Sequence, residues 1–251
     1  MGMRSPVATI QCQDKIFSNI EAVIFDKDGT LADVESYLKS LAQKRSRLSD
    51  AQVPGVQEPL LLAFGVEEGQ LNPAGLQAVG SRRENEIATA AYIAETGKDW
   101  LAALEIARSA FSEADSYLKR KVDHTPLFPG TRDVLQALGE VGVKVGILSA
   151  DSPQHVSDFI NCYDLAGCVD AYQGVEDISK PDPRLFEQLC EQLNVSPSHT
   201  LMVGDAQVDL VMGKAASAAG CVQVTWGWSK APFYDEAHVV IEQWQQFQIS
   251  N

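Results

Sequence analysis

The stretch VIFDKDGTLAD, residues 23–33, points to the fold of the whole chain. An apolar run ends at Asp26, a second acid, Asp28, follows two positions later, and Gly29 then permits a turn. Residues two apart on an extended chain face the same side, so both carboxylates can address one site. Two carboxylates this close repel each other. Either the stretch is an ordinary strand-to-turn junction, or a positive group lies between the acids.

Short apolar runs recur along the chain and alternate with segments whose apolar residues have helical spacing. The runs that predict strands are residues 22–25, 143–149, 200–204, 221–225 and 238–241, with a further short strand near 168–172. The segments that predict helices between them are residues 130–141, 153–163, 182–193 and 207–219. This alternation predicts an α/β fold, with a Rossmann-like parallel sheet covered by helices on both faces.

The alternation stops between about residue 36 and residue 123, where Ala, Glu, Lys, Arg and Leu dominate. Long helical patterns fill this segment, and it contains no convincing strand. We therefore expect an inserted, all-helical domain over residues 37–123. The α/β core domain is expected over residues 20–36 and 124–251, and residues 1–19 are expected to form a flexible segment.

Composition narrows the classes of function. The chain has 251 residues and a net charge of −14, with 45% hydrophobic and 22% charged residues. This charge argues against nucleic acid and against an anionic membrane surface as partners. The net charge does not exclude a small anionic substrate. Charges are screened over about 8 Å at physiological salt, so the charges that line a pocket determine whether it binds an anion.

The cysteines and the start of the chain predict a cytoplasmic protein. No CxxC pair occurs, and most of the cysteines lie in apolar company, which favours buried, reduced thiols. The five are Cys12, Cys162, Cys168, Cys190 and Cys221. The first nineteen residues contain no continuous apolar run of the kind found in a signal peptide, and no run approaches the length of a membrane span.

Polar side chains gather where the predicted strands end. Asp26 and Asp28 follow the first strand, Ser149 ends the second, and Asp205 ends a third, with Asp209 four residues later. The carboxyl ends of parallel strands form the usual ligand site of such sheets. Converging carboxylates need a hard cation, and an oxygen-only ligand set suits Mg²⁺. A phosphate beside that cation would suit Lys180, the Ser149 hydroxyl and backbone N–H groups at Gly29.

These residues, taken in order, resemble the four motifs of the haloacid dehalogenase (HAD) superfamily. DKDGTL matches the first motif, Ser149 the second, Lys180 in KPDP the third, and GDAQVD the fourth. The likeness covers roughly residues 20–36 and 124–241, and the insertion corresponds to the family's helical C1 cap. Members with such a cap act on small phosphorylated metabolites, so the resemblance implies a partner of that kind.

The resemblance also implies roles for individual residues. Asp26 would be the nucleophile that forms an aspartyl-phosphate, and Asp28 would protonate the leaving oxygen and later activate water. Mg²⁺ would be held by Asp26, the backbone carbonyl of Asp28 and Asp205, with Asp209 in support. The phosphate contacts would come from Ser149, Ala150, Gly29 and Lys180, the last of which also counts as catalytic.

The chain departs from the family pattern at two points. The second motif reads LSAD, where relatives often have Asn after the Ser or Thr, and Ala206 stands in the fourth motif where Ser is common. Neither change removes a core catalytic group. The stretch TWGW, residues 225–228, resembles the WGY segment of the phosphoglycolate phosphatase-like branch.

Each feature also has a plainer interpretation. DxDGT alone could be a turn, Lys180 alone a surface lysine, and Ser149 alone the end of a strand; their order along the chain favours a site. In the insertion, Arg82 and Arg83 could meet a substrate carboxylate, or Arg82 could form a solvated helical pair with Glu86. The KRSR stretch, residues 44–47, reads as a solvated face. Trp100, Leu101 and Leu104 read as the core of the insertion.

The favoured function is a Mg²⁺-dependent phosphatase of small phosphomonoesters, either phosphoglycolate-like compounds or sugar phosphates. A sugar-phosphate mutase would use the same core motifs, and only its products would tell it apart. A dehalogenase is disfavoured because it needs no second acid at Asp28. A non-catalytic binding module would have been signalled by loss of Asp26, Asp28 or Lys180, all of which are present.

Overall fold

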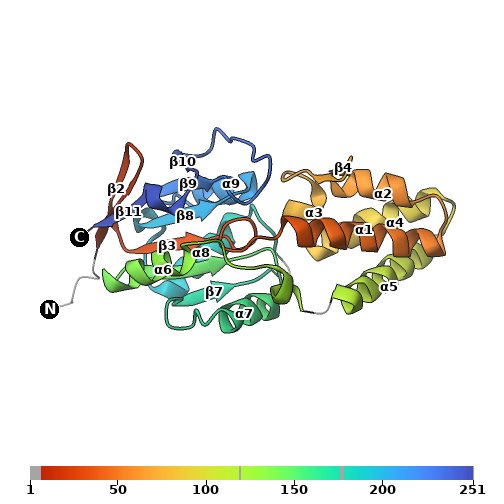
Figure 1. Cartoon of the computed structure of the whole chain (residues 1–251), viewed down its shortest axis with the longest axis horizontal. Helices are drawn as coiled ribbons and strands as arrows, with labels where there is room; N and C mark the ends of the chain where they lie inside the picture. The colour runs from red at the N-terminus through yellow and green to blue at the C-terminus, as the bar shows by residue number, and fades with distance from the viewer. Residues whose placement is uncertain (1–6, 119, 176–177, 251) are drawn as a thin grey trace. The chain divides into compact units, whose positions relative to one another are not determined.

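The computed structural model describes residues 7–118, 120–175 and 178–250. The chain divides into two compact units (Figure 1). One comprises the chain up to Asp33 together with everything from Pro126 onward, and the other is Val34–Thr125. The second unit extends a few residues beyond the predicted insertion at each end.

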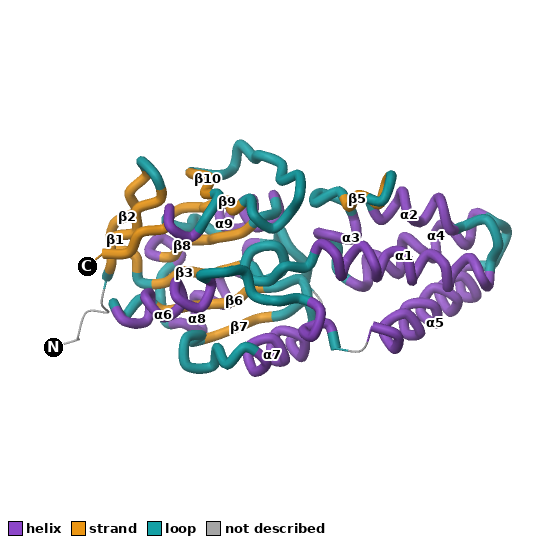
Figure 2. Tube along the Cα trace, viewed as in Figure 1, coloured by secondary structure: helices purple, strands orange, loops and turns teal. Residues whose placement is uncertain are grey.

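A parallel sheet of six strands forms the first unit (Figure 2), as the alternation predicted. The strand order is β10-β9-β8-β3-β6-β7, so the chain's first parallel strand, β3, lies inside the sheet between β6 and β8. The strands are β3 (Ala22–Phe25), β6 (Lys144–Leu148), β7 (Ala171–Gln173), β8 (Thr200–Gly204), β9 (Gly220–Val224) and β10 (Val239–Ile241). Strand order reverses beside β3, which is where such sheets bind ligands.

Four helices cover this sheet at the predicted places. They are α6 (Thr131–Glu140), α7 (Pro153–Cys162), α8 (Pro183–Leu193) and α9 (Gln207–Ala215). On one face, Ala22 and Ile24 of β3 pack with Leu189 of α8 and Leu210 of α9 in a fully buried cluster. All four residues of β3 are buried, as expected for a central strand covered on both faces. The α/β fold class is confirmed.

The expectation that residues 1–19 are flexible is wrong for the part that the structure describes. β1 (Ala8–Cys12) and β2 (Lys15–Ile20) form an antiparallel hairpin, and β11 (Phe247–Ser250) pairs with the other edge of β1. Ala8, Ile10 and Cys12 alternate on the buried face of β1. One partner strand of β1, β11, lies more than 230 residues away, and the alternation within β1 does not reveal that partner. Residues 1–6 lie outside the described part of the chain.

The second unit is helical apart from one short hairpin, which corrects the expectation of an all-helical insertion. The hairpin is formed by β4 (Val66–Glu67) and β5 (Gln70–Leu71). The helices are α1 (Glu35–Gln52), α2 (Gln57–Phe64), α3 (Leu76–Val79), α4 (Arg82–Glu95) and α5 (Trp100–Leu118). Short 3-10 helices occupy Lys121–His124 in this unit and Pro197–His199 and Trp244–Gln246 in the other.

The core of the helical unit differs from the expected one. Trp100 and Leu101 are 47% and 77% exposed, so they are not core residues. The buried face of α5 instead consists of four alanines and one phenylalanine: Ala103, Ala107, Ala110, Phe111 and Ala114. The small alanine side chains let neighbouring helices pack closely. Arg45, expected on a solvated face, is only 5% exposed and lies 4.1 Å from the centre of the Phe111 ring.

Two further features bear on the expected character of the protein. All five cysteines are free; Cys12, Cys190 and Cys221 are buried, Cys168 is partly buried and Cys162 is exposed. Within the described residues, no helix combines the length and the apolar character that a membrane crossing requires.

Candidate active site

The acids of the first and fourth motifs follow two neighbouring strands. β3 and β8 are parallel and in register from Ala22 beside Thr200 to Phe25 beside Val203. The Asp26 N–H donates to the Val203 carbonyl over 2.8 Å, which continues the pairing by one residue. Asp26 and Asp205 therefore leave the sheet side by side, and Asp209 joins them from the first turn of α9.

Asp26, Asp205 and Asp209 form one buried cluster around Lys180. Each acid offers a carboxylate oxygen, and these oxygens lie within 4.8 Å of one another. Lys180 Nζ donates to Asp26 Oδ1 at 2.5 Å and to Asp209 Oδ1 at 2.6 Å. The Lys180 side chain is only 3% exposed. The structure thus brings together four residues that lie up to 183 positions apart, from Asp26 to Asp209.

Burial and mutual repulsion perturb the acids of this cluster. Burial raises the pKa of the Asp26 carboxyl to about 7, with Lys180 opposing that rise and Asp209 adding to it. Burial also holds the pKa of Asp205 well above its usual value, reinforced by the charges of Asp26 and Asp209. Burial alone would lower the pKa of Lys180, but Asp209 and Asp26 outweigh burial and raise it.

The donor set fits a hard divalent cation. With all groups charged, three carboxylates and one ammonium leave an excess of two negative charges in a buried site. Carboxylate oxygens are the ligands that Mg²⁺ and similar ions prefer. A cation held by Asp26, Asp205 and Asp209 would favour their charged forms and so relieve the repulsion that raises the pKa of Asp26 and of Asp205.

Asp28 has a different environment from the three clustered acids. Its carboxylate, 18% exposed, pairs with Lys27 Nζ, and Lys27 also contacts Asp151 Oδ2 at 2.9 Å. Lys27 is only 2% exposed, which is unusual for a lysine without such partners. The Asp28 side chain therefore lies outside the cluster that could hold a metal through carboxylates. The ligand expected from Asp28 was its backbone carbonyl, and that role stays a prediction.

The predicted phosphate-binding residues lie around the same strand ends. Ser149 follows β6, is 1% exposed, and accepts a 3.1 Å hydrogen bond from the Asp151 N–H through its hydroxyl. Ala150, the next residue, is partly buried. Gly29 has φ +87°, and a Cβ there would lie 2.6 Å from Asp205 Oδ2. Glycine at this position lets the loop after Asp26 pass against the clustered acids.

The two arginines predicted in the insertion lie on α4 and differ in their contacts. Arg82 Nε donates to Glu86 Oε1 at 2.8 Å, which is the helical pair offered as the plainer interpretation. Arg82 also pairs with Asp115 of α5. Arg83 is exposed and forms no ion pair within the described part of the chain. A substrate role for either arginine stays a prediction.

Sequence reasoning missed three residues of this site. Thr30 Oγ1 donates to Asp205 Oδ1 at 2.8 Å, and Trp228 Nε1 donates to Asp205 Oδ2 at 2.6 Å. Lys27 is the third, because nothing in the sequence spacing indicates that it pairs with Asp28 and Asp151. Thr30 and Trp228 stand in the stretches DKDGTL and TWGW, so the signal was present but their contacts could not be assigned from it.

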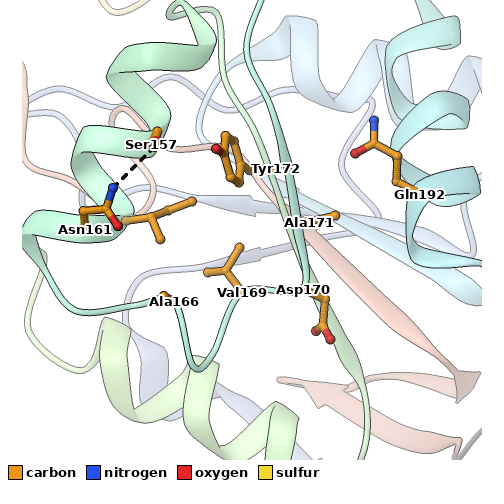
Figure 3. Close-up of a pocket in the computed structure, with 9 residues that line it drawn as sticks. Ser157, Asn161, Ala166, Val169, Asp170, Ala171, Tyr172 and Gln192 are labelled. Atoms are coloured by element: carbon orange, nitrogen blue, oxygen red, sulfur yellow. Dashed lines mark hydrogen bonds between the residues drawn. The ribbon is translucent and has the colours of Figure 1, made fainter.

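A groove of about 460 Å³ is lined by other residues, and none of these acids is among them (Figure 3). Its walls include Ser157 and Asn161 of α7, Tyr172 of β7 and Gln192 at the end of α8. Asp170 is the only charged residue among those described that line it, and its carboxylate accepts the Val145 N–H at 2.8 Å. A groove without a cation is a poor phosphate site, so the acid cluster remains the candidate active site.

Comparison with known proteins agrees with the motifs. The family model of haloacid dehalogenase-like hydrolases matches residues 20–217. The phosphoglycolate phosphatase of Escherichia coli (strain K12) is 28% identical over 222 residues, which are 85% of this chain and 84% of that protein. The phosphoglycolate phosphatase of Salmonella choleraesuis (strain SC-B67) is 27% identical over 91% of this chain and 88% of its own length.

Solved structures show the same fold. A "predicted phosphoglycolate phosphatase from Haemophilus somnus 129PT" has a TM-score of 0.65 and 19% identity, covering 88% of this chain and 93% of that one. A HAD-superfamily hydrolase, subfamily IA, from Geobacter sulfurreducens PCA has a TM-score of 0.56 and 20% identity, covering 89% and 92%. The family that the four motifs predicted is confirmed: this chain belongs to the haloacid dehalogenase-like hydrolases.

Proposed function

We propose that the protein is a Mg²⁺-dependent phosphatase that hydrolyses a small phosphomonoester through an aspartyl-phosphate on Asp26. The observation that carries the proposal is the buried cluster of Asp26, Asp205 and Asp209 around Lys180, beyond the ends of β3 and β8. Such a cluster destabilises the fold, because three carboxylates are held out of water beside one lysine. Destabilising groups of this kind are typical of functional sites.

The proposed chemistry uses two acids, Asp26 and Asp28. An Asp26 oxygen attacks phosphorus, the bond from phosphorus to the alcohol oxygen breaks, and that oxygen takes a proton from Asp28, which enters this step as the carboxylic acid. Asp28, now a carboxylate, then removes a proton from water as the water attacks the phosphorus of the aspartyl-phosphate. This step releases inorganic phosphate and regenerates Asp26. Asp28 is suited to proton transfer because its side chain is partly open to solvent and lies outside the metal cluster.

The other groups of the site bind and orient. Lys180 already contacts Asp26 Oδ1, so it can hold the nucleophile and pair with a phosphate oxygen. Ser149 and the backbone N–H groups near Gly29 offer further hydrogen bonds to that phosphate. A bound divalent cation would neutralise charge on the phosphate oxygens and hold them in line with Asp26.

The substrate is proposed as a small metabolite, either a phosphoglycolate-like compound or a sugar phosphate. Curated relatives at 27–28% identity are phosphoglycolate phosphatases, which makes phosphoglycolate the first compound to test. The decisive experiment screens phosphorylated metabolites with the purified protein and Mg²⁺, measuring phosphate release and analysing the organic product. Release of stoichiometric phosphate supports a phosphatase, whereas an isomeric sugar phosphate without released phosphate would contradict one.

Removing divalent metal should eliminate activity. We expect EDTA treatment to abolish phosphate release, Mg²⁺ to restore it, and Ca²⁺ to inhibit. Mg²⁺ requires a tight octahedron that fixes its ligands, whereas Ca²⁺ accepts looser and higher coordination. The control is the preformed Mg–EDTA complex, which should leave activity unchanged. Full activity after exhaustive dialysis against EDTA would refute a metal-dependent mechanism.

Arg82 and Arg83 of α4 should differ in function, one acting on stability and the other on substrate binding. If the substrate carries a carboxylate, Arg83→Ala should raise the KM for that substrate about tenfold or more, because one charge-assisted contact contributes about 1.5–3 kcal/mol. The KM for p-nitrophenyl phosphate should stay the same. Arg82→Ala should act mainly on thermal stability, because Glu86 and Asp115 lose their partner. Arg47→Ala, an exposed arginine of α1, is the control. Equal KM changes for both substrates would remove Arg83 from substrate recognition.

A further inference from the structure

The segment Trp226–Trp228 follows β9 and contacts the acid cluster and the loop after Asp26 at three points. Trp226 Nε1 donates to the Thr30 carbonyl at 3.0 Å. A Cβ on Gly227 would lie 2.0 Å from the Gly29 carbonyl oxygen, so the two backbones touch there. Trp228 Nε1 donates to Asp205 Oδ2 at 2.6 Å. One short segment therefore contacts both the loop after Asp26 and an acid of the cluster.

The contact at Trp228 is buried and leaves Asp205 little freedom. Trp228 is 7% exposed and Asp205 is 3% exposed. The two carboxylate oxygens of Asp205 accept from different donors, Oδ1 from Thr30 and Oδ2 from Trp228. Two donors on opposite oxygens fix the plane of the carboxylate, while each oxygen keeps a further lone pair for another ligand. Hydrogen bonds from buried donors to a charged carboxylate are among the stronger ones in proteins.

The segment itself is anchored to the core of its unit. The Trp226 ring lies 4.4 Å from the Trp244 ring, centroid to centroid. Trp244 in turn packs edge-on against Phe25, the last residue of β3. The indole of Trp228 is therefore presented to Asp205 from a rigid support, as a group that orients another side chain must be.

We infer that Trp228 is a positioning residue for the divalent cation: its indole N–H sets the orientation in which Asp205 meets the metal. The inference rests on the proposed metal-dependent function. Partners that orient a metal ligand typically change metal affinity by about 10–100-fold when removed. Trp228→Phe deletes the N–H and keeps an aromatic ring, so we expect it to weaken Mg²⁺ binding about tenfold or more.

A matched control is available in the same unit. Trp244 is 6% exposed, and its Nε1 donates to the Thr131 hydroxyl at 3.2 Å rather than to an acid of the cluster. Trp244→Phe therefore removes a buried indole N–H of similar exposure, keeps an aromatic ring beside Phe25 and Trp226, and touches no proposed metal ligand. Its Mg²⁺ affinity should stay within about twofold of the wild-type value, which separates the loss of the Trp228 hydrogen bond from general loosening of the core.

The test is calorimetric titration of the metal-free proteins with Mg²⁺, without substrate. A tenfold weaker affinity for Trp228→Phe, with the Trp244→Phe affinity unchanged, supports the inference; kcat at saturating Mg²⁺ should then recover toward wild type. Equal affinities for Trp228→Phe and wild type would overturn the inference and leave the proposed function intact. Wild-type protein that binds no Mg²⁺ would overturn both. Should Trp228→Phe fail to fold, benzothienylalanine at position 228 keeps the indole shape without the N–H, and the same two outcomes decide.

Discussion

The Asp26→Asn variant should release phosphate at least about a thousandfold more slowly than the wild-type protein, because removing a covalent nucleophile costs several orders of magnitude in rate. An amide oxygen is a poor nucleophile toward phosphorus, and the substitution also removes one negative charge from the cluster with Asp205 and Asp209. Steady-state phosphate release with the best substrate measures the effect. Turnover near the wild-type rate would exclude Asp26 as the nucleophile.

The same variant should fold normally, which separates lost chemistry from lost structure. Burial raises the pKa of Asp26 from its ordinary 3.8 to about 7. Since the unfolded chain releases that proton more readily, the folded state loses stability as pH rises from about 4 to about 7 in metal-free protein. Asparagine carries no such penalty, so the thermal unfolding midpoint of the Asp26→Asn variant at pH 7 should be no lower than that of the wild-type protein. Asp133→Asn, an exposed change on α6, is the control and should keep full activity.

Gly29→Ala should have the second large effect. Gly29 has φ +87°, which L side chains rarely adopt, and a Cβ there would lie 2.6 Å from Asp205 Oδ2. The strained backbone costs about 1–2 kcal/mol and the collision with a packed group about 1–3 kcal/mol more. Displacement of Asp205 should also lower activity about a hundredfold or more, since a misplacement of about 1 Å can cost that much.

Gly97→Ala isolates the backbone part of this effect. Gly97 has φ +97°, but a Cβ there meets nothing within 4 Å. Its substitution should therefore cost only the strain of about 1–2 kcal/mol and leave kcat unchanged. Chemical denaturation measures the free energy of unfolding of Gly29→Ala and Gly97→Ala, and phosphate release measures their kcat. Equal losses of stability, with activity preserved in Gly29→Ala, would mean that the loop can move away from Asp205 without harm.

Much of the α/β unit could be predicted because its signals are local. The four residues of β3 are a continuous apolar run, and the apolar spacing of α8 places Leu185, Leu189 and Leu193 on one buried face. The three-stranded sheet that contains β1 and β2 was not predicted, because its third strand, β11, comes from the other end of the chain. The alternation of Ala8, Ile10 and Cys12 is short, and it carries no information about a partner strand at that distance.

In the candidate site, too, some residues could be located from the sequence and others could not. Asp26, Asp205 and Asp209 stand at strand ends and helix starts, positions that sequence spacing locates well. The spacing of the motifs does not indicate that the Lys27 side chain is buried between Asp28 and Asp151. Arg45 was misassigned for the same reason, since a charged residue on a helix is ordinarily exposed and only tertiary packing buries it against Phe111. Buried charges depend on contacts between distant segments, which spacing does not encode.

In the proposed mechanism the phosphoryl group is carried by Asp26, and this aspartyl-phosphate can be trapped. The wild-type protein is mixed with its best substrate and Mg²⁺, quenched in acid within milliseconds, digested, and analysed by mass spectrometry. We expect one added phosphoryl group on the peptide that contains Asp26, and none in the Asp26→Asn variant. Rapid turnover with that peptide unmodified, or with the phosphoryl group on another residue, would contradict it.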